Sequence, residues 1–451
     1  MVDAMAASAE DYLIDSVSFK LPNTASYVID RRSVSYWTAG ANEYASGTGS
    51  KVARINITGD GWLDPSTVRL SYTLENMDGT VNHNLRPLTG PWGFFRRARC
   101  MVGGAIVDDI DYYNRVHEML HILTSKGNRD NDDVEGFSER WDSDRVYFET
   151  DKYLVGIPPN GSRAVSFKPL FGIMNQPKYI PLSWCPLTLE FEIASLATDP
   201  VVAGGGVGKY DDNVSTSWKI KDIRIICDVV TLDSGLQNSY AEHVLSGKSL
   251  PINYGTYISQ FQSLGTDASN FSVTITRAVT RLKSMFVNFD RLHGTTNMND
   301  GMRTNVNSFV HPMYMQDYSL GAYNFKKELQ WQVQIGSKLF PEYPCTSLAQ
   351  TFYQLKKALG IHGSAYHNIA ITAAQYRNDH FIIGIDTEKI LEAGFTGLNS
   401  RAGDLMVVKG KAANGGDLNH SATIPWANSI YIILHTDQIL EIRDTGVQVF
   451  D

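Results

Sequence analysis

The stretch FGIMNQPKYIPLSWCPLTLEFEIAS, residues 171–195, ends in a strict alternation of apolar and polar side chains. Leu187, Leu189, Phe191 and Ile193 fall on one face of an extended strand, with threonine and glutamate between them. One apolar and one polar face are typical of an antiparallel sheet that covers a core on one side only. The stretch therefore predicts a β-strand of a sandwich.

Three prolines precede this strand, at Pro177, Pro181 and Pro186. Each proline fixes its own backbone angle and lacks an N–H donor. We expect them to hold an extended approach and to keep the strand from slipping in register or pairing with a foreign strand. A second passage with prolines, residues 339–346, is expected to play a comparable part ahead of a helix in the second half.

Short strand-like runs separated by turn signals fill most of the chain, which is typical of sandwiches and barrels. Besides the opening strand, they cover residues 51–59, 66–76, 94–107, 162–170 and 218–232. Helical patterns start near Asp or Ser and stop at Gly, mainly at residues 111–127, 234–247 and 347–360. Long surface excursions outside the core are expected at residues 127–145 and 394–423.

One arrangement occurs twice, at a spacing of a whole domain. Residues 97–120 read as strand, glycine turn, apolar triplet, acidic loop and amphipathic helix. Residues 330–359 read the same way, with Gly336 in the place of Gly103. Residues 222–232 and 429–439 share a further alternation that closes each half. We therefore expect two similar halves of about 200 residues each.

The length of 451 residues exceeds what a single core usually serves, which supports this division. Residues 1–33 are expected to be an N-terminal arm, and residues 234–256 a linker helix with its connection. The two sandwiches are then expected at residues 34–233 and 257–451.

The composition is that of a globular protein with an acidic balance. Hydrophobic residues make up 43% of the chain, charged residues 20%, and the formal net charge is -8. This disfavours a main surface that grips nucleic-acid phosphates, because such a surface needs a basic field. The sequence shows neither a basic and apolar leader nor an apolar run of membrane-spanning length. We expect synthesis inside the cell, without a secretory signal peptide or a transmembrane segment.

The cysteines indicate neither a zinc site nor a disulfide framework, because they are far apart and form no C-x-x-C pair. They are Cys100, Cys185, Cys227 and Cys345. This usage fits a reducing compartment.

Two short motifs resemble ligand loops but fail at key positions. Residues 203–210 end like a phosphate-binding loop, yet Ala203 replaces its first glycine and Tyr210 its metal-binding hydroxyl, so we expect a plain loop between strands. Residues 129–136 resemble a calcium loop, yet Val134 occupies a ligand position and the closing glutamate is missing. We expect a solvated acidic loop there, with adventitious divalent-cation binding as the alternative.

His117 and His121 lie four residues apart in the expected helix and could chelate a metal through one face. A third ligand is missing, and both histidines fit an ordinary amphipathic pattern beside Leu120 and Leu123. We therefore expect helix histidines and not a metal site.

Residues 91–99 combine basic and aromatic side chains, which could stack with and neutralise nucleic acid. The residues concerned are Trp92, Phe94, Phe95, Arg96, Arg97 and Arg99. The competing interpretation, favoured by the acidic net charge, is a strand whose alternate residues face a neighbouring subunit.

The order of these signals resembles that of the double jelly-roll major capsid proteins of double-stranded DNA viruses, most of all their polinton and adintovirus branch. The resemblance is carried by SYVIDRRSVSYWTAGANEYAS (26–46), LDPSTVRLSYTLEN (63–76), LRPLTGPWGFFRRARCMVGGAIVDDIDYYNRVHEML (85–120) and the opening stretch. It continues through residues 271–291 and 330–359.

This resemblance implies an all-β fold: two consecutive eight-stranded antiparallel jelly rolls with a few short inserted helices. It further implies homotrimers that act as pseudo-hexagonal capsomers, tile an icosahedral virion shell and meet penton and minor capsid proteins. Such proteins are not enzymes, so no catalytic, cofactor-binding or metal-binding residue is carried over, and no cofactor or specific nucleic-acid recognition is expected. Only Lys20, Arg31 and Arg32 are basic in the first 32 residues, which argues against genome contact by the arm.

The alternative function is that of a carbohydrate-binding or carbohydrate-cleaving β-sandwich protein. Glu190 and Glu192 share one face of a strand at a spacing of about 7 Å, which suits the carboxylate pair of an inverting glycosidase. Carboxylates on the solvent face of a strand are mostly ordinary surface, so the structural role is preferred.

Overall fold

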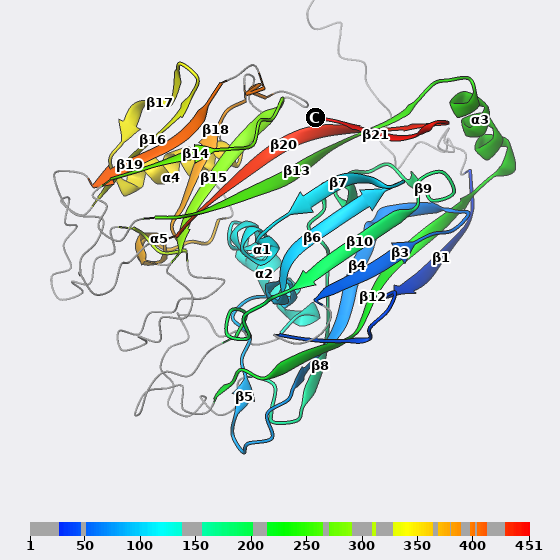
Figure 1. Ribbon diagram of the computed structural model, residues 1–451, viewed down its shortest axis with the longest axis horizontal. Helices are drawn as coiled ribbons and strands as arrows, with labels where there is room; N and C mark the ends of the chain where they lie inside the picture. The colour runs from blue at the N-terminus through cyan, green and yellow to red at the C-terminus, as the bar shows by residue number, and fades with distance from the viewer. Residues whose placement is uncertain are drawn as a thin grey trace, which may run out of the picture.

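A computed structural model shows the chain as two β-sandwiches side by side, connected at one end by helix α3 (Figure 1). It describes residues 27–46, 51–137, 156–201, 214–264, 270–290, 309–312, 328–363, 369–378, 380–388, 397–401, 404–412 and 429–451. Among these residues, no helix combines the length and the apolar character needed to cross a bilayer.

The first sandwich consists of two main sheets, with the strand orders β1-β12-β4-β8 and β3-β10-β6-β7. Its strands are β1 (Val28–Trp37), β2 (Glu43–Ala45), β3 (Val52–Ile57), β4 (Trp62–Asn76), β5 (Asn84–Leu85), β6 (Phe95–Val102), β7 (Ala105–Ile110), β8 (Ser162–Phe167), β9 (Ile180–Pro181), β10 (Leu187–Ile193), β11 (Val214–Ser215) and β12 (Trp218–Leu232). Its helices are α1 (Tyr113–Ile122), α2 (Lys126–Glu135) and the 3-10 turns η3 (Pro91–Phe94) and η5 (Gly172–Met174).

The second sandwich follows α3 (Ser234–Leu245) and has the orders β13-β20-β15-β18 and β14-β19-β16-β17, with β21 added beside β20. Its strands are β13 (Leu250–Ser263), β14 (Asn270–Ile275), β15 (Leu282–Asp290), β16 (Leu329–Ile335), β17 (Lys338–Cys345), β18 (Ile382–Asp386), β19 (Met406–Ala412), β20 (Ser429–Arg443) and β21 (Gly446–Phe450). Its helices are α4 (Leu348–Ala358) and α5 (Ala373–Asn378).

The two sandwiches have the same topology. When the main strands of each half are numbered along the chain, one sheet has the order 1-8-3-6 and the other 2-7-4-5 in both halves. All of these pairings are antiparallel, and the order is that of an eight-stranded jelly roll. The predicted fold class is confirmed.

The internal repeat also holds at the level of single residues. Gly103 and Gly336 both have positive φ, +56° and +59°, in the tight turns of the β6–β7 and β16–β17 hairpins. The two closing segments become β12 and β20, each of which pairs on both sides within its sheet. The opening strand is β10, and its four apolar residues are all buried.

Four expectations about segment boundaries need correction. Residues 126–135 form helix α2, because Ser125 caps its first turn by accepting a hydrogen bond from Asn128 N, so the acidic stretch is not a loop. The excursion expected at residues 394–423 contains β19, an inner strand of its sheet. Glycine, asparagine and alanine on both sides of β19 hide its short alternation. Strands β1 and β13 begin inside the expected arm and the expected connection.

Most of the buried apolar side chains of the two halves form one continuous cluster, and Trp62, Val230 and Leu232 form a small second one. Each half keeps its own pair of sheets, so the cluster crosses from one half to the other where the two jelly rolls touch.

Candidate functional site

The two jelly rolls meet along a surface that we call the joint. On the first roll it consists of β7, η5 and the beginning of α1; on the second it consists of β13, β20 and β21. In Figure 1, the long strands β13 and β20 run beside α1 and β7.

The backbones of the two rolls come into direct contact at a pair of glycines. A Cβ atom on Gly172 would lie 1.9 Å from the carbonyl oxygen of Gly255, and a Cβ atom on Gly255 would lie 2.8 Å from His435 Nε2. Any larger residue at Gly172 would therefore force the rolls apart. The close approach requires glycine on the first roll.

A buried carboxylate lies next to this contact. Asp108 is 1% exposed and accepts hydrogen bonds from the Thr256 hydroxyl of the second roll, from Gly172 N at 3.2 Å and from Ile173 N at 3.4 Å. Burial raises the pKa of Asp108 to about 6, although these three hydrogen bonds partly oppose the shift. One side chain thus connects β7, η5 and β13.

A buried arginine connects the rolls a few residues further along. Arg115 of α1 is 3% exposed and forms ion pairs with Asp199 of the first roll at 2.9 Å and with Asp290 of the second roll at 3.2 Å. Its guanidinium also lies 5.2 Å from the ring centre of Tyr431. Burial opposes the charge, but the two carboxylates outweigh it and raise the pKa of Arg115.

Aromatic contacts complete the joint. The Tyr112 ring centre lies 5.0 Å from that of Tyr431 and 5.2 Å from that of Phe261. The Tyr254 hydroxyl lies 2.7 Å from Gln438 Oε1 and 3.2 Å from the Val107 carbonyl. Backbone contact, buried charge and edge-on and tilted ring contacts together fix the mutual orientation of the two rolls, so the chain behaves as one slab.

The basic and aromatic residues of 91–99 are divided between the core and the outer face of their sheet. Trp92, Phe94 and Phe95 are buried and cannot stack on bases. The arginines are ion-paired: Arg96 with Glu192 and Asp111, Arg97 with Asp109, and Arg99 with Asp109 and Glu190, at distances of 2.7–3.9 Å. Their positive charge is therefore neutralised by the same sheet, β3-β10-β6-β7.

The carboxylate pair considered for carbohydrate chemistry is engaged in the same ion pairs. Glu190 is only 8% exposed, which contradicts its expected solvent-facing position, because the Arg54 guanidinium covers it with a hydrogen bond of 2.9 Å. Glu192 pairs with Arg96 at 3.6 Å. Neither carboxylate faces an open sugar-binding surface in the described part of the chain.

The histidine pair belongs to the packing of α1. The His117 ring stacks on Trp92 at 4.1 Å between ring centres, and His121 faces Asp132 of α2 at 3.4 Å. Burial, and next the neighbouring His121, lowers the pKa of His117 to about 3. The described residues contain no group of three or more side chains that could hold a metal ion. The phosphate-loop look-alike at residues 203–210 lies outside the described residues.

The repeated strand order and the joint define the class of the protein: it has a double jelly-roll fold. No protein-family model and no curated protein matches the sequence. Solved structures match in fold, among them a chain of the "Crystal structure of PBCV-1 VP54 fitted into a cryo-EM reconstruction of the virophage Sputnik", with 12% identity, a TM-score of 0.59 and coverage of 96% of this chain and 99% of that one.

Two further structures share the fold over similar lengths. A chain of the cryo-EM structure of the Sputnik virophage has 10% identity, a TM-score of 0.57 and coverage of 98% and 93%. The Faustovirus major capsid protein has 9% identity, a TM-score of 0.55 and coverage of 94% and 93%. At these identities the likeness establishes the double jelly-roll fold.

The sequence alone did not reveal the residues of the joint. Asp108, Arg115 and Asp290 each interrupt an apolar pattern, which was the one available signal. A charged residue in an apolar face indicates a buried partner. It does not show where in the chain that partner lies, and Thr256 is 148 residues from Asp108.

Proposed function

We propose that this chain is a structural major capsid protein of a double-stranded DNA virus and belongs to the virion. It assembles as a homotrimer, the trimer forms a pseudo-hexagonal capsomer, and capsomers tile an icosahedral shell. The proposal is supported by the double jelly-roll fold, which the chain shares with the Faustovirus major capsid protein over nearly its whole length.

The observation that carries the trimer is a pair of exposed surfaces in the described part of the chain. In the joint, β13 buries Ile252, Tyr254 and Thr256. Its counterpart in the first roll, β1, buries no residue along its ten positions, and Ile29 is 67% exposed. An open edge strand of this kind needs a cover.

The second roll has the complementary open surface. Strand β17 and helix α4 occupy the places that β7 and α1 occupy in the first roll. Of β17 only Cys345 is buried, and large side chains remain exposed, Tyr343 by 55% and Tyr353 by 48%. Within one chain the joint places β7 and α1 of the first roll against β13 of the second. The equivalent contact between two copies would place β1 of one copy against β17 and α4 of the other.

Contacts of this kind run head to tail and form closed rings when the rotation allows it. Six similar rolls, two from each chain, close with a turn of about 60° per contact. In the purified protein we expect a particle of three times the chain mass of 50.2 kDa, measured by mass photometry, and hexagonal outlines in negative stain. A monomer at micromolar concentration would contradict the proposal.

The equivalence of the rolls predicts a particular pair of residues between copies. Arg32 of β1 pairs with Val229 of β12, as Thr256 of β13 pairs with Thr436 of β20, so Arg32 holds the position in the first roll that Thr256 holds in the second. Thr256 contacts Asp108 within one chain. Arg32 is therefore expected to face the counterpart of Asp108 in another copy, the stretch Phe340–Glu342 of β17. Arg32 and Glu342 are both exposed in the single chain.

Charge reversal tests this pairing. Arg32→Glu alone and Glu342→Arg alone should each weaken the trimer about tenfold, because like charges then face each other. The double variant should recover most of the affinity, as measured by mass photometry across a dilution series. If the double variant dissociates as readily as the worse single variant, the predicted contact is wrong.

We further propose the polinton and adintovirus-like branch, on the order of sequence signals in residues 25–232, together with penton and minor capsid proteins as partners. We also propose that the arm ends before Val28 and that the second roll starts at Leu250, where the strands begin. The role is that of a building block and not of an enzyme, which is supported by the engagement of Glu190, Glu192 and His117 in packing and ion pairs.

A further inference from the structure

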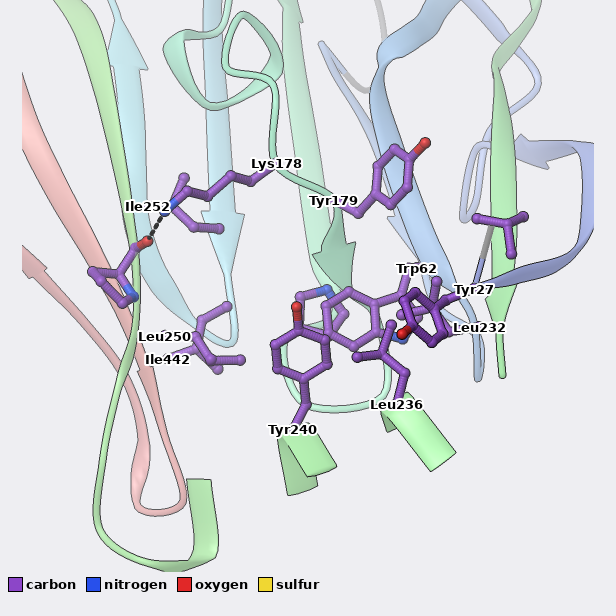
Figure 2. A pocket seen from close by; sticks show the side chains of 13 residues that line it. Tyr27, Trp62, Lys178, Tyr179, Leu232, Leu236, Tyr240, Leu250, Ile252 and Ile442 are labelled. Atoms are coloured by element: carbon purple, nitrogen blue, oxygen red, sulfur yellow. Dashed lines mark hydrogen bonds between the residues drawn. The ribbon is translucent and has the colours of Figure 1, made fainter. Parts of the chain in front are cut away.

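A groove of about 480 Å³ opens between the two jelly rolls beside α3. Figure 2 shows Trp62 of the first roll, Leu236 and Tyr240 of α3, and Leu250 and Ile442 of the second roll around it. Lys178 is the one charged residue among those that line the groove. Its volume lies within the range of ligand pockets, roughly 300–1,000 Å³.

The walls of the groove are apolar and partly open to solvent. The Trp62 ring lies 5.3 Å from the Tyr240 ring, and Leu250 and Ile442 face them from the other roll. A partly open apolar groove of this kind is a candidate binding site.

The chain itself leads into the groove. Tyr27 and Val28 are the first described residues, both line the groove, and they are 55% and 37% exposed. Tyr27, which follows residues 1–26 in the sequence, therefore lies at the wall of the groove. Within them, LIDSVSF (residues 13–19) alternates, so that in an extended conformation Leu13, Val17 and Phe19 share a face with Asp15.

That face complements the groove in both polarity and charge. Three apolar side chains meet an apolar wall, and one carboxylate meets one ammonium group. Lys178 Nζ donates one hydrogen bond to the Pro251 carbonyl at 2.8 Å, and an ammonium group has three donors. Lys178 can therefore bind Asp15 without giving up its contact to the second roll.

We propose that residues 13–19 of the same chain occupy this groove, with Asp15 paired to Lys178 and Val17 packed against α3. The seven residues 20–26 reach about 23 Å when extended, which is enough for the segment to turn back from Tyr27. A tethered segment acts at millimolar effective concentration, whereas a second copy loses translational freedom on binding. The segment then connects the first roll, α3 and the second roll at the end of the slab, independently of any role in a capsid.

A disulfide between the segment and α3 tests the proposal in the full chain. In the variant Val17→Cys with Leu236→Cys, mild oxidation should give an intrachain bond, detected by non-reducing electrophoresis and peptide mass spectrometry. Ser18→Cys with Leu236→Cys is the matched control, because Ser18 lies on the opposite face, and it should cross-link about tenfold less. The four native cysteines are buried and do not compete.

Equal cross-linking at both positions would overturn the docking of this face, and an interchain bond would show that a second copy fills the groove. Hydrogen exchange of the unmodified chain gives a measurement that depends on no variant. Amides of residues 13–19 should exchange about tenfold or more slowly than an unprotected peptide. Exchange at the unprotected rate would overturn the proposal.

Discussion

Replacing Arg115 by methionine is expected to destabilise the chain by about 3–5 kcal/mol, because it leaves two carboxylates without their counter-charge in a buried site. Asp290 is 2% exposed, and the Asp199 side chain is 12% exposed. The free energy of unfolding, measured by urea titration, should fall by this amount. The loss is a large fraction of the 5–15 kcal/mol by which domains are typically stable.

The matched control is Arg97→Met on the outer face of β6. Arg97 and Asp109 form an ion pair of 2.7 Å with the same chemistry, but their side chains are 31% and 28% exposed. Exposed pairs contribute about 0–1 kcal/mol, so this variant should remain close to the parent. Equal losses in the two variants would show that the Arg115 ion pairs do not hold the joint.

A compensating variant separates loss of charge balance from loss of packing. Adding Asp199→Asn and Asp290→Asn to Arg115→Met removes the uncompensated charges and should recover part of the lost stability. If the triple variant is less stable than Arg115→Met alone, the hydrogen bonds of the two aspartates matter more than their charges.

The sequence predicted the elements that carry a local signal, such as strands with one apolar and one polar face. The apolar alternation of β10 spans the whole strand, and that of β12 spans most of it with breaks at Asp222 and Val230; the observed bounds of both are those expected from the pattern. Gly103 and Gly336 identified the repeated hairpin because a positive φ strongly favours glycine. These signals are local, and local signals can be read without knowledge of the partner.

The missed elements are those whose partners are distant or absent. Strand β1 contains no fully buried residue, and only Val34 and Tyr36 are partly buried against the core, so its apolar alternation is too short to detect. Strand β19 contains Gly410, whose missing Cβ leaves room for the Phe271 ring of the neighbouring strand, and this glycine looked like a loop signal. The joint was missed for the same reason, since Gly172 gains its meaning only beside Gly255.

Acidification is expected to weaken the fold between pH 6.5 and 4, with buried histidines as the main cause. Burial lowers the pKa of His117 and of His311 to about 3 and that of His435 to about 4. The unfolded chain binds these protons near pH 6.5, whereas the folded chain does not. Below pH 6.5 the unfolded state therefore holds more protons, and stability falls as the pH falls.

Asp108 acts in the opposite direction. Its pKa is about 6 in the folded chain against 3.8 for the free side chain, so between these values the folded state holds the extra proton and gains stability as the pH falls. Each titrating group contributes about 1.4 kcal/mol per pH unit. The three histidines lower the free energy of unfolding as the pH falls, and Asp108 raises it. Together they give a net loss of about 3 kcal/mol per pH unit between pH 6 and 4.

The two contributions can be separated by variants whose effects on the pH slope have opposite signs. His117→Gln should reduce the slope by about 1.4 kcal/mol per pH unit, and Asp108→Asn should increase it by a similar amount. Urea titrations at pH 7, 6 and 5 give the free energies of unfolding from which the slopes follow. A stability that stays constant or rises from pH 6.5 to 5 would contradict the assignment. Asp108 and His435 of β20 both lie at the joint, beside Gly172 and Gly255, so the two opposite contributions to the pH slope meet at the contact between the rolls.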